Sequence, residues 1–322
     1  MAGSYTIALR AIGKEANAIQ NTNALMRSFV TVNVLQQARG SSMSIRLFIL
    51  VLYAISMPSI ADVKSTMFSY TNLPDIEVFY STPDTVDENT KILFIMHGAS
   101  RTAENYLAAW QPFIKGRNVI AIAPKFTKEL FPYYVTLMRA TTDGELLKDP
   151  SLYLDKIIPT MFDVFKAKLG VKSNQYRIYG HSGGSQFVHR FLLLHGDSRI
   201  DKAVMANAGF YTFLDPDIPY PFGIKNLNIS DEQLSAFLWK KNAILLGDQD
   251  IDTRHRSLNR TRQAKKQGKH RFERGTNFFF DLVRLGESKQ LPFRWRYEVV
   301  KGVEHSNQGM TPAAASFLLE DL

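Results

Sequence analysis

Residues 176–184, Tyr-Arg-Ile-Tyr-Gly-His-Ser-Gly-Gly, decide the fold of this chain. The pattern Gly180-x-Ser182-x-Gly184 is weak by itself, since three fixed residues recur by chance in unrelated chains. Here, however, a β-rich apolar run precedes it and a helical pattern follows it. A sharp turn from strand to helix strains its central residue and leaves room only for glycine on either side. The stretch therefore predicts a raised serine hydroxyl at a helix N-terminus; the alternative is a glycine-rich turn in which Ser182 only caps the helix.

Strand-like and helical segments alternate along the rest of the chain. Apolar, β-rich runs occupy 76–80, 92–96, 119–123, 176–179, 203–206, 243–246 and 295–300. Helical spacing of apolar residues marks 103–115, 152–169, 186–195, 277–285 and 312–319. Several of the β-rich runs are apolar throughout, as in strands that are buried on both faces. We therefore expect an α/β fold with a mostly parallel central sheet and helices on both faces.

The candidate base is His305. A serine hydroxyl needs a base to take its proton, and the base needs a carboxylate to orient it. Of the seven histidines, His305 alone lies in a loop directly after a strand near the C-terminus. The others include His189 and His195 in a predicted helix, His255 and His270 in a basic stretch expected to face water, and His181 beside the serine. The order serine, aspartate, histidine matches one known order of catalytic triads.

Three aspartates compete for the role of the acid in the loop that follows Gly247. We choose Asp250, because a residue three positions after the end of the strand can turn back toward His305. Asp252 is the next candidate. Asp248 fits better as a residue that ties down the backbone of its own loop.

Two backbone N–H groups are candidates for stabilising an oxyanion. The first belongs to Gly183, the residue after the serine. The second belongs to Ala99, because His97-Gly98-Ala99 directly follows another buried strand. Metal-ligand spacings, phosphate-binding glycine loops and dinucleotide motifs are missing from the sequence, so we expect no metal and no cofactor.

These motifs resemble those of the α/β-hydrolase superfamily over nearly all of residues 69–322. They are Gly-His-Ser-Gly-Gly at the serine, Gly-Asp-Gln-Asp at the acid and Val-Glu-His at the base. The chain is most similar to the esterase branch with polyhydroxybutyrate-depolymerase-like and feruloyl-esterase-like proteins. The resemblance implies an α/β-hydrolase fold with a small lid or loop excursion, and its Gly-x-x-Asp pattern favours Asp250. The oxyanion segment, residues 97–100, departs from the HGGG-type lipases and esterases because it lacks their three glycines.

A proline-dense, aromatic segment at 211–239 lies between two predicted strands. It fits an acyl pocket or lid beside the active edge of the sheet. Tyr211, Tyr220 and Phe222 are the candidate lining residues. The alternative is that they pack a long connection onto the body of the protein.

Charge and composition exclude several classes of protein. The 322 residues carry a net charge of +9 and no cysteine, which excludes a thiol nucleophile. Residues 252–274 hold nine Lys and Arg against two acids. Their single aromatic residue is unlike a stacking surface for nucleic acid, so we expect no nucleic-acid partner. The default is a solvated excursion, and the functional alternative is attraction of an anionic substrate or surface to the rim of the site.

A leader precedes the catalytic domain, which we place at 62–322. Residues 43–61 have the parts of a secretory signal peptide: Arg46, an apolar run, and the small residues Ser59 and Ala61. The run is shorter than the roughly 20 apolar residues of a bilayer span. Residues 1–42 are then an over-extended gene start or, alternatively, an organelle transit peptide. We expect a periplasmic or secreted protein without stable membrane insertion after cleavage; the alternative is a membrane anchor.

The sequence thus predicts a serine hydrolase that cleaves carboxylic esters, small or polymeric, through an acyl-enzyme. A serine peptidase on the same fold and a catalytically silent binding protein are the alternatives. The acyl group, the alcohol group and the oligomeric state stay open, because specificity depends on pocket geometry and not on the triad.

Overall fold

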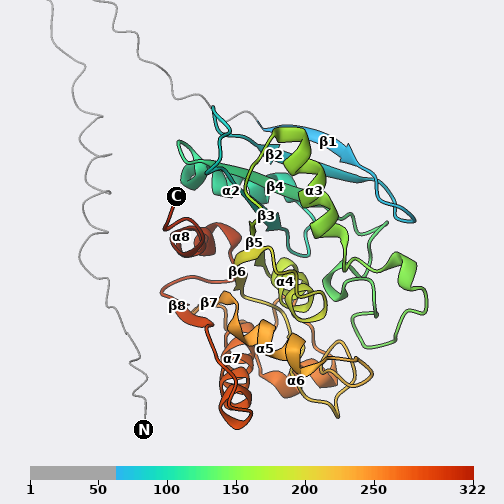
Figure 1. Cartoon of the computed structure of the whole chain (residues 1–322). Coiled ribbons are helices and arrows are strands. Elements are labelled where there is room, and N and C mark those ends of the chain that lie inside the picture. Colours follow the sequence, from blue (N-terminus) through green and yellow to red (C-terminus); the bar gives the residue numbers. More distant parts are fainter. Residues whose placement is uncertain (1–62) are drawn as a thin grey trace, which may run out of the picture. The chain divides into compact units, whose positions relative to one another are not determined.

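One eight-stranded sheet runs through residues 63–322, the part of the chain that the computed structural model describes (Figure 1). The predicted signal peptide at 43–61 lies outside these residues. The strands are β1 (Lys64–Phe68), β2 (Ile76–Ser81), β3 (Lys91–Met96), β4 (Val119–Lys125), β5 (Tyr176–His181), β6 (Ile200–Ala206), β7 (Lys241–Gly247) and β8 (Arg296–Val300). Their spatial order is β1-β2-β4-β3-β5-β6-β7-β8. Because β2 alone pairs antiparallel with both of its neighbours, the predicted mostly parallel sheet is confirmed.

Helices cover both faces of the sheet. They are α2 (Ala103–Ile114), α3 (Ile157–Leu169), α4 (Gly183–Leu194), α5 (Asp231–Trp239), α6 (Arg262–Gln267), α7 (Arg271–Ser288) and α8 (Asn307–Leu318), with short 3-10 helices η1 (Tyr134–Thr136) and η2 (Pro150–Leu152). The apolar side chains of α2 and α8 share one cluster with one face of the sheet. Those of α3, α4, α5 and α7 share a second cluster with the opposite face.

The continuous apolar runs are explained by this two-sided burial. In β3, Ile92, Phe94 and Met96 contribute to the cluster beneath α3 and α4. Leu93 and Ile95, which alternate with them, contribute to the cluster beneath α2 and α8. Successive side chains of a strand point to opposite faces, so a strand covered on both sides needs apolar residues at every position.

The basic stretch at 252–274 agrees with the expected solvated excursion for seven of its nine Lys and Arg, which are exposed, but not for Arg271 and Arg274. It contains all of α6 and the first turn of α7, and Arg271 and Arg274 are each only 1% exposed. Apolar spacing had marked only 277–285 as helical, whereas α7 begins six residues earlier at Arg271. That first turn is held by buried hydrogen bonds of its arginines, which hydrophobic periodicity does not detect.

Candidate active site

Ser182 occupies a strained turn between β5 and α4. Its backbone has φ 57° and ψ −115°, a conformation that costs a non-glycine residue about 1–3 kcal/mol. A Cβ on Gly184 would lie 1.9 Å from the carbonyl oxygen of Met96, and one on Gly180 would lie 2.3 Å from the carbonyl carbon of Gly184. Both flanking positions therefore require glycine. The Ser182 N–H donates to the carbonyl of Ala206, at the end of β6, over 2.9 Å.

Ser182, His305 and Asp250 come together at the carboxyl ends of β5, β8 and β7. The Oγ of Ser182 lies 2.9 Å from Nε2 of His305, and Nδ1 of His305 lies 2.7 Å from Oδ2 of Asp250. Since a carboxylate only accepts hydrogen bonds, the imidazole proton is assigned to Nδ1, which leaves Nε2 free to accept from the serine. Ser182 is 7% exposed and Asp250 2% exposed, so the chain of hydrogen bonds is largely shielded from water.

The other two aspartates of the loop that follows Gly247 have different partners, and Asp248 holds the loop after β8 and not, as we expected, the backbone of its own loop. Asp248 accepts a hydrogen bond of 2.7 Å from the N–H of Gly302 and lies 3.5 Å from Nζ of Lys301. Asp252 is exposed and accepts from the N–H of Arg254 over 2.8 Å. Of the three candidates, Asp250 is the one whose carboxylate contacts His305.

The two candidate oxyanion donors are close neighbours. A Cβ on Gly183 would lie 3.3 Å from the backbone nitrogen of Ala99 and 3.1 Å from Cγ1 of Val135. Within residues 63–322, neither the Ala99 nor the Gly183 amide donates a hydrogen bond to another backbone carbonyl across the fold. Both amides are thus adjacent to Ser182 and available to a bound ligand.

His97 fixes the oxyanion segment. Its Nδ1 lies 3.0 Å from the carbonyl of Gly98, and its Nε2 accepts from the N–H of Phe126 over 2.9 Å. The hydroxyl of Tyr134 donates to the carbonyl of His97 over 3.1 Å. Burial lowers the pKa of His97 to about 3, so the ring is neutral and can act as donor and acceptor at once. These bonds hold residues 97–99 in place beside the serine.

His181 packs against the base. Its ring centroid lies 4.8 Å from that of His305, and its Nδ1 lies 3.0 Å from the hydroxyl of Tyr106. Burial keeps the pKa of His181 well below its usual range. The neutral ring therefore shapes the wall beside His305 without adding a charge to it.

Two residues that contact the site, His255 and Arg271, were not predicted from the sequence. His255 lies with its ring centroid 5.1 Å from that of His305, although the basic stretch was expected to face water. Nη1 of Arg271 donates to Oδ1 of Asp250 over 3.2 Å. Nine Lys and Arg crowd 252–274, and their spacing contains no signal that distinguishes the one that turns inward to the acid.

A cavity of about 360 Å³ adjoins the oxyanion segment and has a basic lining. Ala99, Val135, Gln186 and Phe210 form part of its wall, and three cationic residues but no acidic residue line it; the cations are Arg101, Lys128 and Arg256. Lys128 and Arg256 are exposed at its rim. This is the electrostatic character of a site that attracts negatively charged ligands.

The aromatic residues proposed as a pocket lining do not line this cavity. Tyr211 and Tyr220 are 0% and 1% exposed, and the Tyr220 hydroxyl donates to the carbonyl of Thr136 over 2.7 Å. Phe222 is 4% exposed and packs against Phe210, with ring centroids 4.9 Å apart. Their positions correspond to the packing alternative, and Phe210, against which Phe222 packs, is the aromatic residue on the wall.

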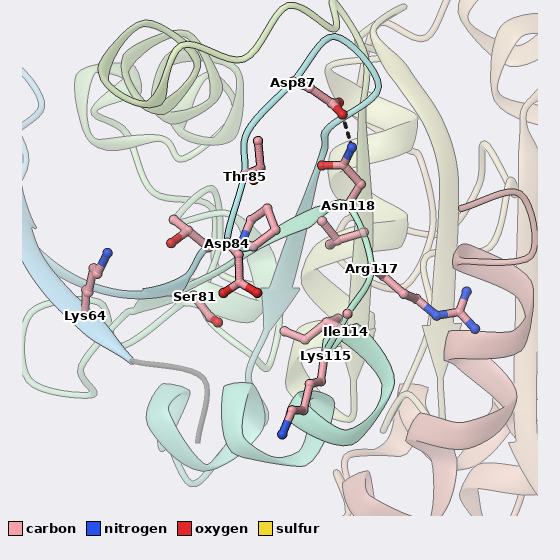
Figure 2. Close-up of a pocket in the computed structure, with 13 residues that line it drawn as sticks. Lys64, Ser81, Asp84, Thr85, Asp87, Ile114, Lys115, Arg117 and Asn118 are labelled. Carbon is pink, nitrogen blue, oxygen red and sulfur yellow. Dashed lines mark hydrogen bonds between the residues drawn. The ribbon is translucent and has the colours of Figure 1, made fainter. Parts of the chain in front are cut away.

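A second cavity, drawn in Figure 2, lies at the amino ends of β3 and β4. It measures about 620 Å³ and is lined by residues that precede β3 and β4, among them Asp84, Asp87, Arg117 and Asn118. Asp87 accepts a hydrogen bond of 2.6 Å from Asn118, and Arg117 donates to the carbonyl of Leu322 over 3.1 Å. None of Ser182, Asp250 and His305 lines it.

Residues 63–322 contain no group of three or more His, Cys, Asp or Glu side chains arranged to hold a metal ion. Nor does this part of the chain contain a helix that is long and apolar enough to cross a membrane.

Comparisons with solved structures place this fold in a family. No protein-family model and no curated protein matches the chain. Among solved structures, poly(aspartic acid) hydrolase-1 from Sphingomonas sp. KT-1 is 36% identical, with a TM-score of 0.75 over 80% of this chain and 98% of that one. A poly(3-hydroxybutyrate) depolymerase from Bordetella parapertussis is 24% identical, with a TM-score of 0.74 over 81% of this chain and 90% of that one. A fluorophosphonate-binding serine hydrolase from Staphylococcus aureus has the same fold at 16% identity, with a TM-score of 0.50 over 80% of this chain and 97% of that one. The chain belongs to the α/β-hydrolase superfamily, as a hydrolase with an esterase-type fold.

Proposed function

We propose that this hydrolase cleaves carboxylic esters through a Ser182–His305–Asp250 triad and an acyl-enzyme. The observation that carries the proposal is the unbroken chain of hydrogen bonds, 2.9 Å and 2.7 Å long, from the serine hydroxyl through the imidazole to the carboxylate. An aligned base activates a serine that is otherwise a poor nucleophile, and a buried carboxylate stabilises the imidazolium that forms.

The reaction runs in two halves. As the Ser182 Oγ attacks the carbonyl carbon, its proton passes to Nε2 of His305 and the carbonyl electrons move to the oxygen. The imidazolium, held by Asp250, gives this proton to the departing alkoxide oxygen as the ester C–O bond breaks. A water molecule then attacks the acyl-enzyme and loses its proton to His305. Collapse of that second intermediate returns the proton to Ser182 and releases the carboxylic acid.

The amides of Ala99 and Gly183 are the oxyanion donors in this proposal. They adjoin each other beside the serine, and each such donor contributes on the order of 3 kcal/mol to stabilising the transition state. The N-terminus of α4, which begins at Gly183, adds the favourable end of a helix dipole. Both effects act on negative charge that exists only during the reaction.

A second candidate, amide hydrolysis in an anionic polymer, is favoured by two specific observations. The cavity beside Ala99 presents three cations and no acid. The 36% identical Sphingomonas protein is described as a hydrolase of poly(aspartic acid), a polyamide that carries a carboxylate on every unit. The same triad would serve, with His305 giving its proton to the departing amine nitrogen.

The experiment that tests both candidates compares wild type with Ser182→Ala on matched substrates. We expect wild type to hydrolyse short acyl p-nitrophenyl esters, and Ser182→Ala to lower kcat by about 10⁴ or more. A fluorophosphonate should label wild type and leave Ser182→Ala unlabelled. Full activity in the variant would remove the triad from the mechanism, and an unlabelled, inactive wild type would favour the silent binding protein. Release of amine ends from poly(aspartic acid) at a rate above that of ester cleavage would favour the amide candidate.

We also propose that residues 43–61 direct export of the enzyme. The support is the order of a basic start, an apolar run and small residues at Ser59 and Ala61. Sequencing the N-terminus of protein recovered from the extracytoplasmic fraction should return Asp62 as the first residue. An intact leader on cytosolic protein would contradict export, and recovery of the uncleaved chain in the membrane fraction would indicate an anchor.

A further inference from the structure

Arg271 is a buried cation that reaches the acid of the proposed triad from outside the triad. It is in the first turn of α7, and its side chain is 0% exposed while that of Asp250 is 1% exposed. A guanidinium that is removed from water this completely is costly unless it has specific partners. Its contacts therefore show what the fold uses it for.

The two oxygens of the Asp250 carboxylate have different partners. Oδ2 contacts Nδ1 of His305 over 2.7 Å, and Oδ1 accepts from Nη1 of Arg271 over 3.2 Å. The N–H of Phe272 also donates to the Asp250 carbonyl over 3.3 Å, which ties the start of α7 to the acid loop. With one oxygen held by Arg271, the carboxylate cannot rotate without breaking a buried ion pair. The arginine thus fixes which oxygen faces the base.

The second terminal nitrogen of Arg271 holds the loop that follows the acid. Nη2 donates to Oγ of Ser257 over 2.9 Å and to Nδ1 of His255 over 3.1 Å. A guanidinium is only a donor, so His255 accepts at Nδ1 and has its proton on Nε2. Ser257 and its neighbour Arg256 line the basic cavity. One side chain therefore connects the catalytic acid to the wall of the candidate substrate site.

Several titratable groups lie near His305. Three titratable side chains contact His305, namely Asp250, His181 and His255. Arg271 and Asp252 lie just beyond them. Tyr106 contacts His181 from α2, and burial raises the pKa of that tyrosine. Burial keeps the pKa of His181 and of His255 below the usual range, so both rings are neutral near pH 7. Arg271 is then the cation nearest the acid, where it competes with the imidazolium for the same carboxylate.

We propose that Arg271 is a positioning residue of this site: it fixes the Asp250 carboxylate and residues 255–257 in one arrangement. The proposal rests on the triad proposed above. A carboxylate held in one orientation keeps the imidazole of His305 aligned with Ser182, so Arg271 acts on kcat through Asp250.

The test compares Arg271→Gln, which removes the charge, with Arg271→Lys, which keeps it. The readout is the division of the effect between kcat and KM with p-nitrophenyl acetate, a neutral ester. We expect Arg271→Gln to lower kcat by about ten- to a hundredfold with a nearly unchanged KM, because the base is no longer held in line. Arg271→Lys should lose only part of kcat. Arg254→Gln removes the same charge from an exposed position of the same loop and should leave both constants unchanged.

Several measurements distinguish the positioning role of Arg271 from a purely structural role. Titration of active sites with a fluorophosphonate corrects kcat for any unfolded fraction, so a mere loss of folded enzyme leaves the corrected kcat unchanged. If Arg271→Gln does not fold, Ser257→Ala breaks one Nη2 contact with the charge retained, and a fall in kcat with an unchanged KM is then expected. A corrected kcat of Arg271→Gln that equals wild type, or a Ser257→Ala variant with wild-type kcat, would overturn the proposal. Residual activity in Ser182→Ala would instead overturn the triad itself.

Discussion

Ser182 and His305 are 123 residues apart in the sequence, yet Oγ of the one lies 2.9 Å from Nε2 of the other. Their strands, β5 and β8, are not neighbours, because β6 and β7 lie between them in the sheet. Asn207, which directly follows β6 and is fully buried, connects the end of β7 with the loop that follows β8. Its Oδ1 accepts from the N–H of Gly247 over 2.9 Å, and its Nδ2 donates to the carbonyl of Glu304 over 3.4 Å. The side-chain amide of Asn207 thus holds together the loop that contains Asp250 and the loop that contains His305.

Replacing Asn207 by alanine should therefore affect both stability and catalysis. The buried N–H of Gly247 would lose its partner and the carbonyl of Glu304 would lose one of its two, which costs about 1–3 kcal/mol of the free energy of unfolding. The loops of Asp250 and His305 would also lose their common support, so kcat should fall while KM changes little. Urea unfolding and steady-state kinetics measure the two effects. Asn89→Ala, at an exposed position, is the matched control and should change neither; wild-type kcat in Asn207→Ala would contradict the bridging role.

Gly183→Ala should lower kcat strongly and lower the free energy of unfolding only slightly. The new Cβ would lie 3.1 Å from Cγ1 of Val135 and 3.3 Å from the nitrogen of Ala99. The side chain of Val135 can move away, whereas the contact with Ala99 would displace the two proposed oxyanion donors. Loss of one donor lowers kcat by on the order of 10²–10³. Gly286→Ala in α7 is the control, since its Cβ would meet nothing closer than 3.7 Å. Equal kcat values for Gly183→Ala and wild type would exclude these amides from catalysis.

Acid should destabilise the protein in part through its C-terminus. Burial raises the pKa of Asp321, but hydrogen bonds from Arg177 and Lys202 outweigh this effect and hold the pKa below its usual range. A carboxylate with a lowered pKa in the folded state stabilises it above about pH 4, and this contribution is lost as the pH falls further. Asp321→Asn should therefore lower the melting temperature at neutral pH and flatten its fall in acid.

The size of that effect is limited by solvent. The side chain of Asp321 is 51% exposed, so its contribution is at most about 1 kcal/mol after screening. Asp231, 83% exposed and paired with Lys289, provides the control, and Asp231→Asn should leave the melting curve unchanged. A melting temperature of Asp321→Asn that equals wild type at pH 7 would show that the C-terminal pair contributes nothing.

Sequence patterns predicted the fold better than the surroundings of the site. The seven β-rich runs all became strands, because burial on both faces leaves a signal at every residue. β1 was missed: it lies at the edge of the sheet, and only Phe68 of its five residues is buried. An edge strand needs few apolar residues, so its sequence resembles that of a loop.

The site itself was predictable only where chemistry restricts the residue type. Glycines beside a strained serine and an aspartate three residues after a strand leave such a pattern. The inward turn of Arg271 and His255 leaves none, because a buried arginine and a solvated one are identical in sequence and differ only in their partners. For the same reason, the aromatic residues at 211–222 could not be divided into packing and lining residues before their neighbours were known.

The basic cavity should discriminate between substrates by charge. Lys128 and Arg256 are exposed at its rim, and each exposed charge contributes less than about 1 kcal/mol to binding an anion. For the double variant Lys128→Gln/Arg256→Gln, we therefore expect KM for p-nitrophenyl succinate, an anionic ester, to rise about three- to tenfold at low salt. KM for the neutral p-nitrophenyl butyrate should stay the same. Raising the ionic strength should produce the same selective rise in wild type, because salt screens exposed charges. Arg284→Gln removes a charge that is 69% exposed on α7 and serves as the control for net charge. A rise in KM that is equal for both esters, or equal in the control, would show that the cations of this cavity do not contact the substrate.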